Sequence, residues 1–261
     1  MLVSLYSAAT GMNAEQRKLD IISNNLANVD TTGYKKQRAE FQDLLYSSVK
    51  ESGTPTAQGS ILPTGLYVGH GTRLSSTTRI FTLGNIEPTD NSTDLAIMGD
   101  GFFQVQMQDG RIAYTRDGSF KIDANGRLTT SDGLMIIPNI VIPENSVGIN
   151  ISPDGIVSVV LGDGSIQNVG NMTTIRFLNP SGLKPMGNNL YIETPASGNA
   201  VEGIPGQDGF GSLQQGYLEK SNVDVVKEMV DMIIAQRAYD INSKTITTAD
   251  EMLRTVSNIK R

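Results

Sequence analysis

The sequence predicts an α+β protein in which long N- and C-terminal helices pair as a coiled coil. An inserted, mainly antiparallel β domain and an extended Gly/Pro-rich arm lie between them. Three observations lead to this prediction. Apolar residues recur every seven positions at both ends of the chain, Asp-Gly and Asn-Gly dipeptides punctuate the middle, and segments rich in Gly and Pro separate the middle from the ends.

The C-terminal segment carries the longer of the two seven-residue rows. Two turns of an α-helix take about 7.2 residues, so this row forms a slowly drifting stripe along one face, typical of a helix that packs along another. No Gly or Pro interrupts residues 222–261, and a helix of that length would span roughly 55 Å. Ser221 and Asp224 fit a capping box at its start. The row consists of Val225, Met232, Tyr239, Ile246 and Leu253.

The N-terminal segment carries a matching row, and we expect a helix over residues 3–29 that ends before Gly33. Asn13, Asn24, Asn25 and Asn28 are unusual in such a helix, because Asn side chains compete for backbone hydrogen bonds. Either Asn25 and Asn28 lie in fraying last turns, or a buried Asn fixes the register between packed helices. Both terminal helices could also simply pack on one globular core. The row consists of Leu5, Met12, Leu19 and Leu26.

The middle of the chain, from about residue 73 to residue 207, has the pattern of a β meander. Asp-Gly and Asn-Gly supply the positive φ angles of two-residue hairpins, and short strand-like runs lie between them. Further strands are expected near residues 156–161, 173–178 and 189–194. The turn dipeptides are Asp109-Gly110, Asp117-Gly118, Asn125-Gly126, Asp132-Gly133, Asp154-Gly155 and Asp163-Gly164.

Residues 51–71 are rich in Gly, Pro, Ser and Thr, which predicts an extended arm without helix or central strand. The arm is too apolar for a freely solvated linker, so we expect it to lie against neighbouring subunits and to stiffen the assembly. Its apolar residues are Ile61, Leu62, Leu66, Tyr67 and Val68. Just before it, a short helix is expected from Phe41, Leu44, Leu45 and Val49.

The expected domains follow from these segments. Residues 1–33 and 217–261 form a terminal helical domain, and residues 34–72 and 196–216 are extended connectors. Residues 73–195 form a β-rich outer domain. The net charge of −6 comes almost wholly from the middle of the chain, which argues against a nucleic-acid partner, since nucleic acids bind basic surfaces.

Composition excludes several kinds of chemistry. The chain of 261 residues has no Cys and one His, so it offers no disulfide, thiolate site, His-based zinc site or His-containing triad. Asp117, Asp123 and Asp132 could serve as glycosidase acids or Ca²⁺ ligands, but acids beside Gly are what hairpin turns require. We therefore expect no enzyme, no cofactor and no metal. No cleaved signal peptide is expected either, and no apolar run approaches the 18 residues of a membrane span.

Three motifs resemble the bacterial flagellar rod and hook proteins. The N-terminal motif joins residues 24–28 to residues 31–35, the C-terminal motif runs through residues 218–239, and residues 94–103 are similar to the entry of the family's middle domain. Within the family, the chain length and residues 63–69 are most similar to the distal rod subunits. The match covers essentially the whole chain.

The resemblance implies a structural subunit of the flagellar distal rod, a rigid self-assembled tube that transmits torque from the motor to the hook. The terminal helices, with their seven-residue rows, Asn24 and Asn28, would form the inner assembly interface. The implied location is the periplasmic basal body, reached without a cleaved signal. Implied partners are copies of itself, proximal rod and hook-side axial proteins and the surrounding ring proteins. A proximal rod or hook subunit, or a secreted carbohydrate-active or adhesive β protein, remains an open alternative.

Overall fold

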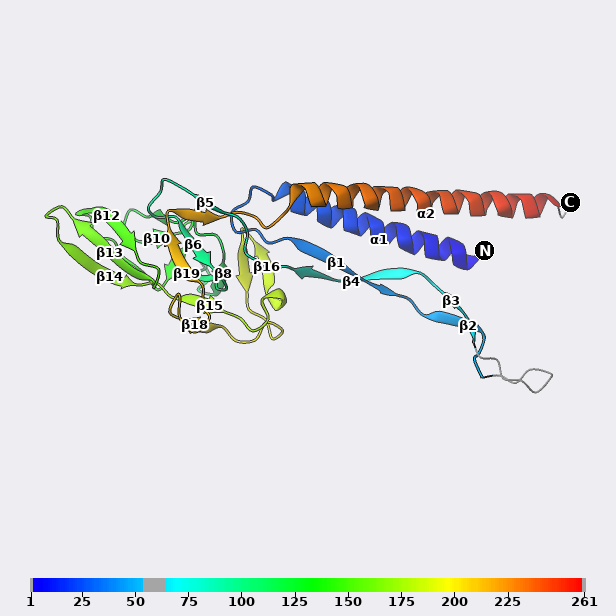
Figure 1. Ribbon diagram of the computed structural model, residues 1–261, viewed down its shortest axis with the longest axis horizontal. Helices are drawn as coiled ribbons and strands as arrows, with labels where there is room; N and C mark the ends of the chain where they lie inside the picture. Colours follow the sequence, from blue (N-terminus) through cyan, green and yellow to red (C-terminus); the bar gives the residue numbers. More distant parts are fainter. Residues whose placement is uncertain (1, 54–63, 260–261) are drawn as a thin grey trace. The chain divides into compact units, whose positions relative to one another are not determined.

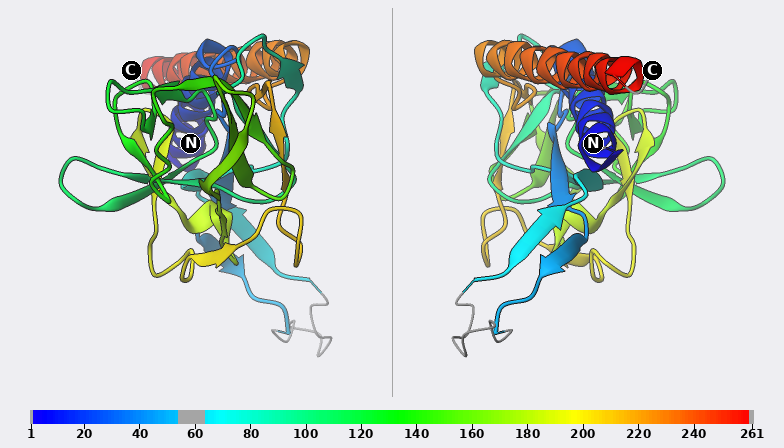
Figure 2. Two further views of the ribbon diagram at one scale, coloured as in Figure 1. Left: turned by 90° about the vertical axis from the view of Figure 1, so that its left-hand side faces the viewer. Right: turned by 90° about the vertical axis from the view of Figure 1, so that its right-hand side faces the viewer.

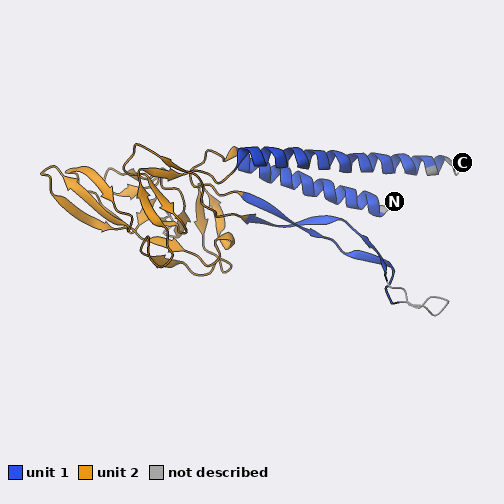
Figure 3. Cartoon of the chain, viewed as in Figure 1, with its two compact units in different colours: residues 1–26, 37–78, 224–261 blue, residues 27–36, 79–223 orange. Residues whose placement is uncertain are grey.

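The computed structural model describes residues 2–53 and 64–259, and the chain divides into two compact units (Figure 3). Unit 1 comprises residues 1–26, 37–78 and 224–261, and unit 2 comprises residues 27–36 and 79–223. This division differs from the expected domains at both junctions. Residues 27–33 and 217–223 group with the β domain because they take part in its hydrogen bonding, as at the bond from Gly33 N–H to Glu219 O of 2.7 Å.

Unit 1 contains two helices, α1 (Leu2–Ala27) and α2 (Val225–Ile259), which run antiparallel and separate toward the start of α1 (Figures 1 and 2). The predicted Ser221 cap is wrong. The Ser221 hydroxyl accepts the Val223 N–H in the turn before the helix, and Asp224 Oδ1 accepts the N–H groups of Val226 and Lys227 at 3.0 and 3.2 Å. Asp224 thus caps α2.

Neither described helix is long and apolar enough to cross a membrane.

Unit 1 also contains two two-stranded sheets where a short helix was expected. Strand β1 (Gln37–Asp43) pairs with β4 (Thr72–Arg79), and β2 (Tyr46–Lys50) pairs antiparallel with β3 (Leu66–Gly69). The helix predicted from Phe41, Leu44, Leu45 and Val49 is therefore wrong. The strands depend on partners well outside one helical turn. Lys50 pairs with Leu66, 16 residues further along the chain, and Leu44 N–H donates to Gly71 O, 27 residues further, at 2.9 Å. Residues Ile61 and Leu62 of the arm lie outside the described residues.

Unit 2 is a β domain whose strand pairs are antiparallel. Its largest sheet has the order β16 (Lys184–Gly187), β17 (Leu190–Ile192), β8 (Ile112–Thr115), β7 (Phe103–Gln106), β11 (Met135–Ile137), β10 (Leu128–Thr129) and β9 (Lys121–Ile122). A three-stranded sheet consists of β12 (Ser146–Ile151), β13 (Ile156–Leu161) and β14 (Ile166–Asn171). The remaining pairs are β6 (Leu95–Met98) with β19 (Ser212–Gln215), β15 (Thr174–Arg176) with β18 (Val201–Gly203), and β5 (Ile86–Pro88) with β20 (Tyr217–Glu219). A short 3₁₀ helix, η1 (Pro180–Gly182), follows β15.

The alternation of side chains along a strand builds two cores in unit 2. Phe102 and Phe103 are neighbours and point to opposite faces. Phe103 joins a large, mainly aliphatic cluster, whereas Phe102 joins an aromatic cluster with Tyr114, Phe177 and Tyr191. Ring pairs in both clusters meet edge to face, an arrangement that aromatic quadrupoles favour. All residues of both clusters lie within residues 79–223, so both cores belong to unit 2.

The turn dipeptides confirm most of the predicted meander. Five of their glycines have positive φ angles, namely Gly110, Gly126, Gly133, Gly155 and Gly164. Gly118 is required for another reason, because a Cβ there would lie 1.7 Å from the Leu95 carbonyl oxygen. Residues 196–216, expected as a connector, instead carry β18 and β19, which pair with strands more than twenty residues earlier.

Candidate assembly surfaces

Helices α1 and α2 meet through small side chains. Ala8 and Ile22 of α1 and Ala235 and Ala249 of α2 are buried. A Cβ placed on Gly11 would lie only 2.9 Å from Nδ2 of Asn242, so the two helices approach closely at this point. The four buried residues and Asn242 each lie three positions after a member of a seven-residue row, as expected for the second half of a seven-residue repeat.

Asn25 links α1 to both of its neighbours in unit 1. Its Nδ2 donates to Glu228 Oε2 at 3.2 Å and to Gln37 O at 2.9 Å, and its Oδ1 accepts the Gln37 N–H at 2.9 Å. Asn25 and Glu228 are both buried. This favours a buried asparagine that fixes helix register over a frayed helix end. The residue is Asn25, whereas Asn24 is exposed and Asn28 Oδ1 accepts the Thr31 hydroxyl at 3.2 Å.

The seven-residue rows flank the centre of this contact. Most of their members are half-buried, while Tyr239 and Leu253 are exposed. Because the helices separate toward the start of α1, the apolar side chains there have room between them. Leu5, Ile246 and Leu253 line an open groove of about 460 Å³. The role of the seven-residue rows in assembly remains a prediction. The half-buried members are Leu5, Met12, Leu19, Leu26, Val225, Met232 and Ile246.

α2 carries a second apolar stripe that the seven-residue row did not reveal. At about 100° per residue, the stripe lies on the side of α2 opposite Ala235 and Ala249, which face α1. A search for apolar residues at steps of three and four would have found it. The stripe consists of the exposed residues Val226, Met229, Val230, Ile233 and Ile241. Among the residues that the structure describes, none covers this apolar face of α2.

Charge does not oppose contact through this face. Unit 1 holds 11 Lys/Arg against 11 Asp/Glu, so unit 2 carries the whole net charge, with 10 against 16.

The paired strands β2 and β3 add further exposed apolar side chains. A two-stranded ribbon of this kind is marginal alone in water and gains stability by packing. The exposed side chains are Leu45, Tyr46, Val49, Leu66, Tyr67 and Val68.

Glu219 lies at the centre of a buried ion cluster in unit 2. Its Oε1 accepts hydrogen bonds from Lys35 Nζ at 2.5 Å and from Gly84 N–H at 2.9 Å, and its Oε2 accepts one from Arg116 at 3.3 Å. The exposed fractions of Lys35, Glu219 and Arg116 are 0%, 1% and 3%. Lys35 and Glu219 are 184 residues apart in the sequence, and spacing alone could not have paired them.

The cluster has the chemistry of a structural centre. Lys35 Nζ also donates to Thr82 O at 2.7 Å, and Arg116 donates to Gly99 O at 2.7 Å. Burial lowers the pKa of Lys35, and the carboxylate of Glu219 acts in the opposite direction. Nearby, the Arg79 guanidinium contacts the rings of Tyr34 and Tyr191 at 5.5 and 5.4 Å from their centroids. Tyr34 and Lys35 of the N-terminal motif thus pack into the β domain.

Two of the three acids considered for catalysis or metal binding, Asp117 and Asp123, are engaged in their own turns. Asp117 Oδ1 accepts the Ser119 N–H at 2.9 Å, and Asp123 pairs with Arg127 at 2.9 Å. Over residues 2–53 and 64–259, no group of three or more His, Asp or Glu side chains could hold a metal ion.

Three family models match the chain. The model for the flagella basal body rod protein matches residues 5–35, and that for the flagellar hook protein FlgE/F/G D1 domain matches residues 96–159. The model for the flagellar basal body rod FlgEFG protein C-terminal region matches residues 214–259. These matches include Lys35, Arg116 and Glu219 of the ion cluster and nearly all of α1 and α2.

Similar proteins span the whole chain. The flagellar basal-body rod protein FlgG of Buchnera aphidicola subsp. Acyrthosiphon pisum is 53% identical over 99% of this chain and 100% of that protein. FlgG of Borreliella burgdorferi is 51% identical over 100% of both chains, and FlgG of Bacillus subtilis is 41% identical over 100% of both. The resemblance seen in the terminal motifs is thereby confirmed, as is the expectation of a structural protein without enzymatic activity. This chain belongs to the flagellar basal-body rod protein family.

Proposed function

We propose that copies of this rod subunit assemble into the distal segment of the flagellar rod, a rigid tube that passes torque from the motor to the hook. The observation that carries the proposal is the exposed apolar stripe of α2 on a charge-balanced unit. Burying a side chain such as Val226 or Ile233 in a subunit contact contributes roughly 1.5–3 kcal/mol. Repeated along a 35-residue helix, such contacts favour a polymer of aligned helices.

In this polymer the terminal helices form the inner part, and α1 and α2 pack as a coiled coil with each other and with neighbouring copies. The seven-residue rows, Asn24 and Asn28 complete the same interface. Support comes from the half-buried state of these rows and from the groove beside Leu5. The β domain then faces outward, which suits its net negative charge.

We further propose the partners and the route that the family resemblance implies. The subunit contacts proximal rod proteins at one end of its segment, hook-side axial proteins at the other, and the basal-body ring proteins around it. It reaches the basal body through the flagellar export channel without a cleaved signal peptide.

Deleting the gene for this chain is expected to leave basal bodies whose rod ends short of the hook, because the distal segment is missing. Electron microscopy of isolated basal bodies measures the rod length directly. Supplying the intact chain in the same strain is the control and should restore the full rod. A rod of normal length in the deletion strain would contradict the distal assignment.

The ribbon of β2 and β3 is proposed to stiffen the polymer by packing on neighbouring subunits, as expected of Leu66, Tyr67 and Val68. Replacing Leu66 and Tyr67 together by Ser should leave rods that form but bend more, because two exposed apolar contacts are lost. The persistence length measured on micrographs of assembled rods is the readout. Thr77→Ala, at an exposed polar position of β4, is the control. Equal stiffness of all three rods would show that the ribbon is only a linker.

A further inference from the structure

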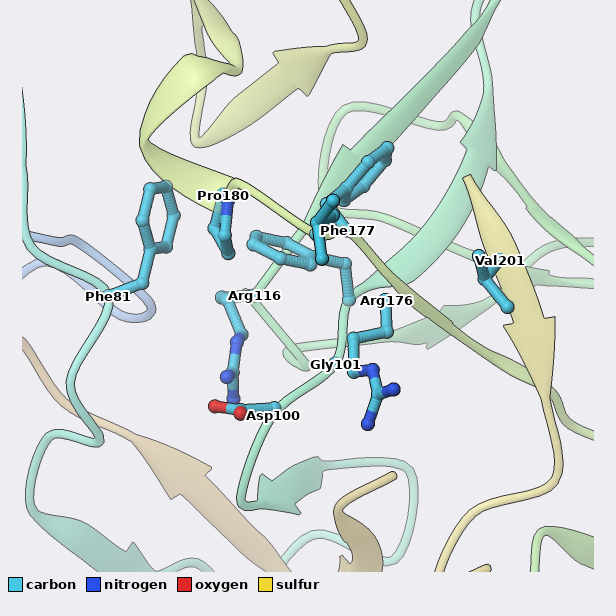
Figure 4. A pocket seen from close by; sticks show the side chains of 10 residues that line it. Phe81, Asp100, Gly101, Arg116, Arg176, Phe177, Pro180 and Val201 are labelled. Carbon is cyan, nitrogen blue, oxygen red and sulfur yellow. The ribbon is translucent and has the colours of Figure 1, made fainter. Parts of the chain in front are cut away.

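The arginines that line a pocket of about 350 Å³ in unit 2 are engaged by unit 2 itself (Figure 4). Arg116 donates to the Glu219 carboxylate, and Arg176 donates to two backbone carbonyl oxygens at 3.3 and 3.2 Å. Asp100 lines the same pocket and offsets part of their charge. Charged side chains without such partners lie instead on the two helices of unit 1.

The exposed residues of α1 form one face on the side away from α2. At about 100° per residue, Asn13, Arg17 and Asp20 lie within about 60° of one another and roughly opposite Ala8 and Ile22, which are buried toward α2. Arg17 and Asp20 form only a loose surface pair, with 3.9 Å between their charged atoms and exposed fractions of 63% and 61%. The exposed face consists of Tyr6, Asn13, Arg17, Asp20 and Asn24.

The outer face of α2 continues past the apolar stripe as a charged face. Asp240 follows Ile233 by seven residues, and Arg237 and Lys244 follow Val230 by seven and fourteen, so all of them share one side of the helix. The side chains of Arg237, Asp240 and Lys244 are exposed and form no hydrogen bond or ion pair with the described residues. These charges are available to a partner.

In the proposed polymer, α2 of one copy meets α1 of the next in an antiparallel orientation. The two helices are antiparallel within each copy (Figure 1). A contact that repeats head to tail along a filament keeps every copy in the same direction along the axis. A helix pair formed between two aligned copies is therefore antiparallel as well.

One antiparallel register places both charges of the α1 face opposite unlike charges of α2. With Arg17 opposite Asp240, Asp20 falls opposite Arg237, because Asp20 lies three residues after Arg17 and Arg237 lies three residues before Asp240. Within one copy these pairs cannot form, since both faces point away from the contact between α1 and α2. The match therefore concerns a second copy.

Shifted registers lose this match. A shift of three or four residues sets Arg17 against Arg237 or Lys244, where like charges repel. A shift of seven residues sets Arg17 against Ile233 or Thr247, which carry no charge. The two unlike pairs thus select one register among its neighbours.

We propose that the charged segment 237–244 of α2 in one copy binds the exposed face of α1 in the next, with Arg17 paired to Asp240 and Asp20 paired to Arg237. The inference rests on the proposed self-assembly and deepens it by naming the second helix face and the register. Exposed ion pairs contribute little affinity each, but they exclude registers in which like charges meet. The contact is also sensitive to salt.

A charge exchange in the full-length chain tests the pairing. Asp240→Arg sets two arginines together and should raise the protein concentration needed for rods about tenfold. Adding Arg17→Asp should restore assembly, because the pair returns with its signs exchanged. Adding Gln16→Asp instead is the matched control and should not restore it, since this exposed position is turned about 100° away on α1. Circular dichroism checks the helix content of each variant.

Cysteine cross-linking reads the register directly, since the native sequence contains no Cys. Asn13 lies four residues before Arg17 and Lys244 four residues after Asp240, so the proposed register sets them opposite each other. In rods of a chain carrying Asn13→Cys and Lys244→Cys, oxidation should link neighbouring copies, because a disulfide requires Cα atoms within about 7 Å. Asn13→Cys with Gln236→Cys is the control and should not link, because those positions face each other only in a parallel pair.

The outcomes separate this inference from the proposed function. Unchanged assembly of Asp240→Arg, equal restoration by Gln16→Asp, or a 13–236 link in place of the 13–244 link overturns the inference and leaves the proposed shaft intact, since native rods still form. A native chain that forms no rods at any concentration overturns the proposed self-assembly and this inference with it.

Discussion

Glu219→Ala is expected to destabilise unit 2 by about 3–5 kcal/mol, the cost of removing one partner from a buried ion pair. The change leaves Lys35 and Arg116 as buried cations without their shared carboxylate, and it also frees the Gly84 N–H. Denaturant unfolding of the full-length chain measures the loss. Near-ultraviolet circular dichroism of the tyrosines reports on unit 2, because Tyr114 and Tyr191 lie in its aromatic core and the chain has no Trp.

Lys220→Ala is the matched control for that measurement. Lys220 is the next residue in the chain, and its ion pair with Glu87, at 3.9 Å, is partly exposed. Exposed pairs contribute less than about 1 kcal/mol. If both variants lost the same small amount of unfolding free energy, the buried cluster would contribute no more to stability than the exposed ion pair.

Local chemistry made much of the fold predictable. The Asp-Gly and Asn-Gly turns were found because the positive φ angle they require depends only on the residues of the turn itself. The terminal helices were found because an apolar repeat of seven residues reports one helix face. Both signals act over a few residues, so no knowledge of the tertiary structure was needed.

Features that depend on distant partners were missed. The strands β1 and β2 were mistaken for a helix because their partners are distant in the sequence: β3 lies at the end of the arm and β4 directly after it. Gly118 was expected to serve a hairpin, whereas a neighbouring strand requires it, since the Leu95 carbonyl oxygen occupies the place of a side chain. The ion cluster of Lys35, Arg116 and Glu219 joins three segments and leaves no periodic trace in the sequence.

Only one side of the candidate assembly surface on α2 was predicted, because a seven-residue repeat reports one helix face. Repeats of seven found the side of α2 near α1, and the residues that α1 covers, Ala235 and Ala249, lie three positions from the predicted row. The opposite face escaped notice because its apolar residues follow the 3.6-residue period without a strict repeat of seven. Its exposure became visible only when the contact with α1 defined which face of α2 is occupied.

Ile233→Asp, on that opposite face, is expected to abolish rod formation and leave the isolated chain folded. Ile233 is half-exposed in the single chain, so a carboxylate there stays hydrated and costs little. In a rod the same position would be buried against a neighbouring copy. An unpaired buried carboxylate costs several kcal/mol, and the cost is repeated in every subunit of the polymer. Sedimentation and electron microscopy of the purified chain measure assembly, and circular dichroism measures the fold.

Ile122→Asp makes the same substitution at an exposed isoleucine of β9, in unit 2, and should assemble normally. The comparison separates the location of the charge from its chemistry, because both variants gain one carboxylate at an exposed apolar position. Loss of assembly in Ile233→Asp alone, with unchanged helix content, would place the subunit contact on the outer face of α2. Normal rods from Ile233→Asp would mean that the polymer leaves this stripe in water, and the seven-residue rows would then be the only helical interface.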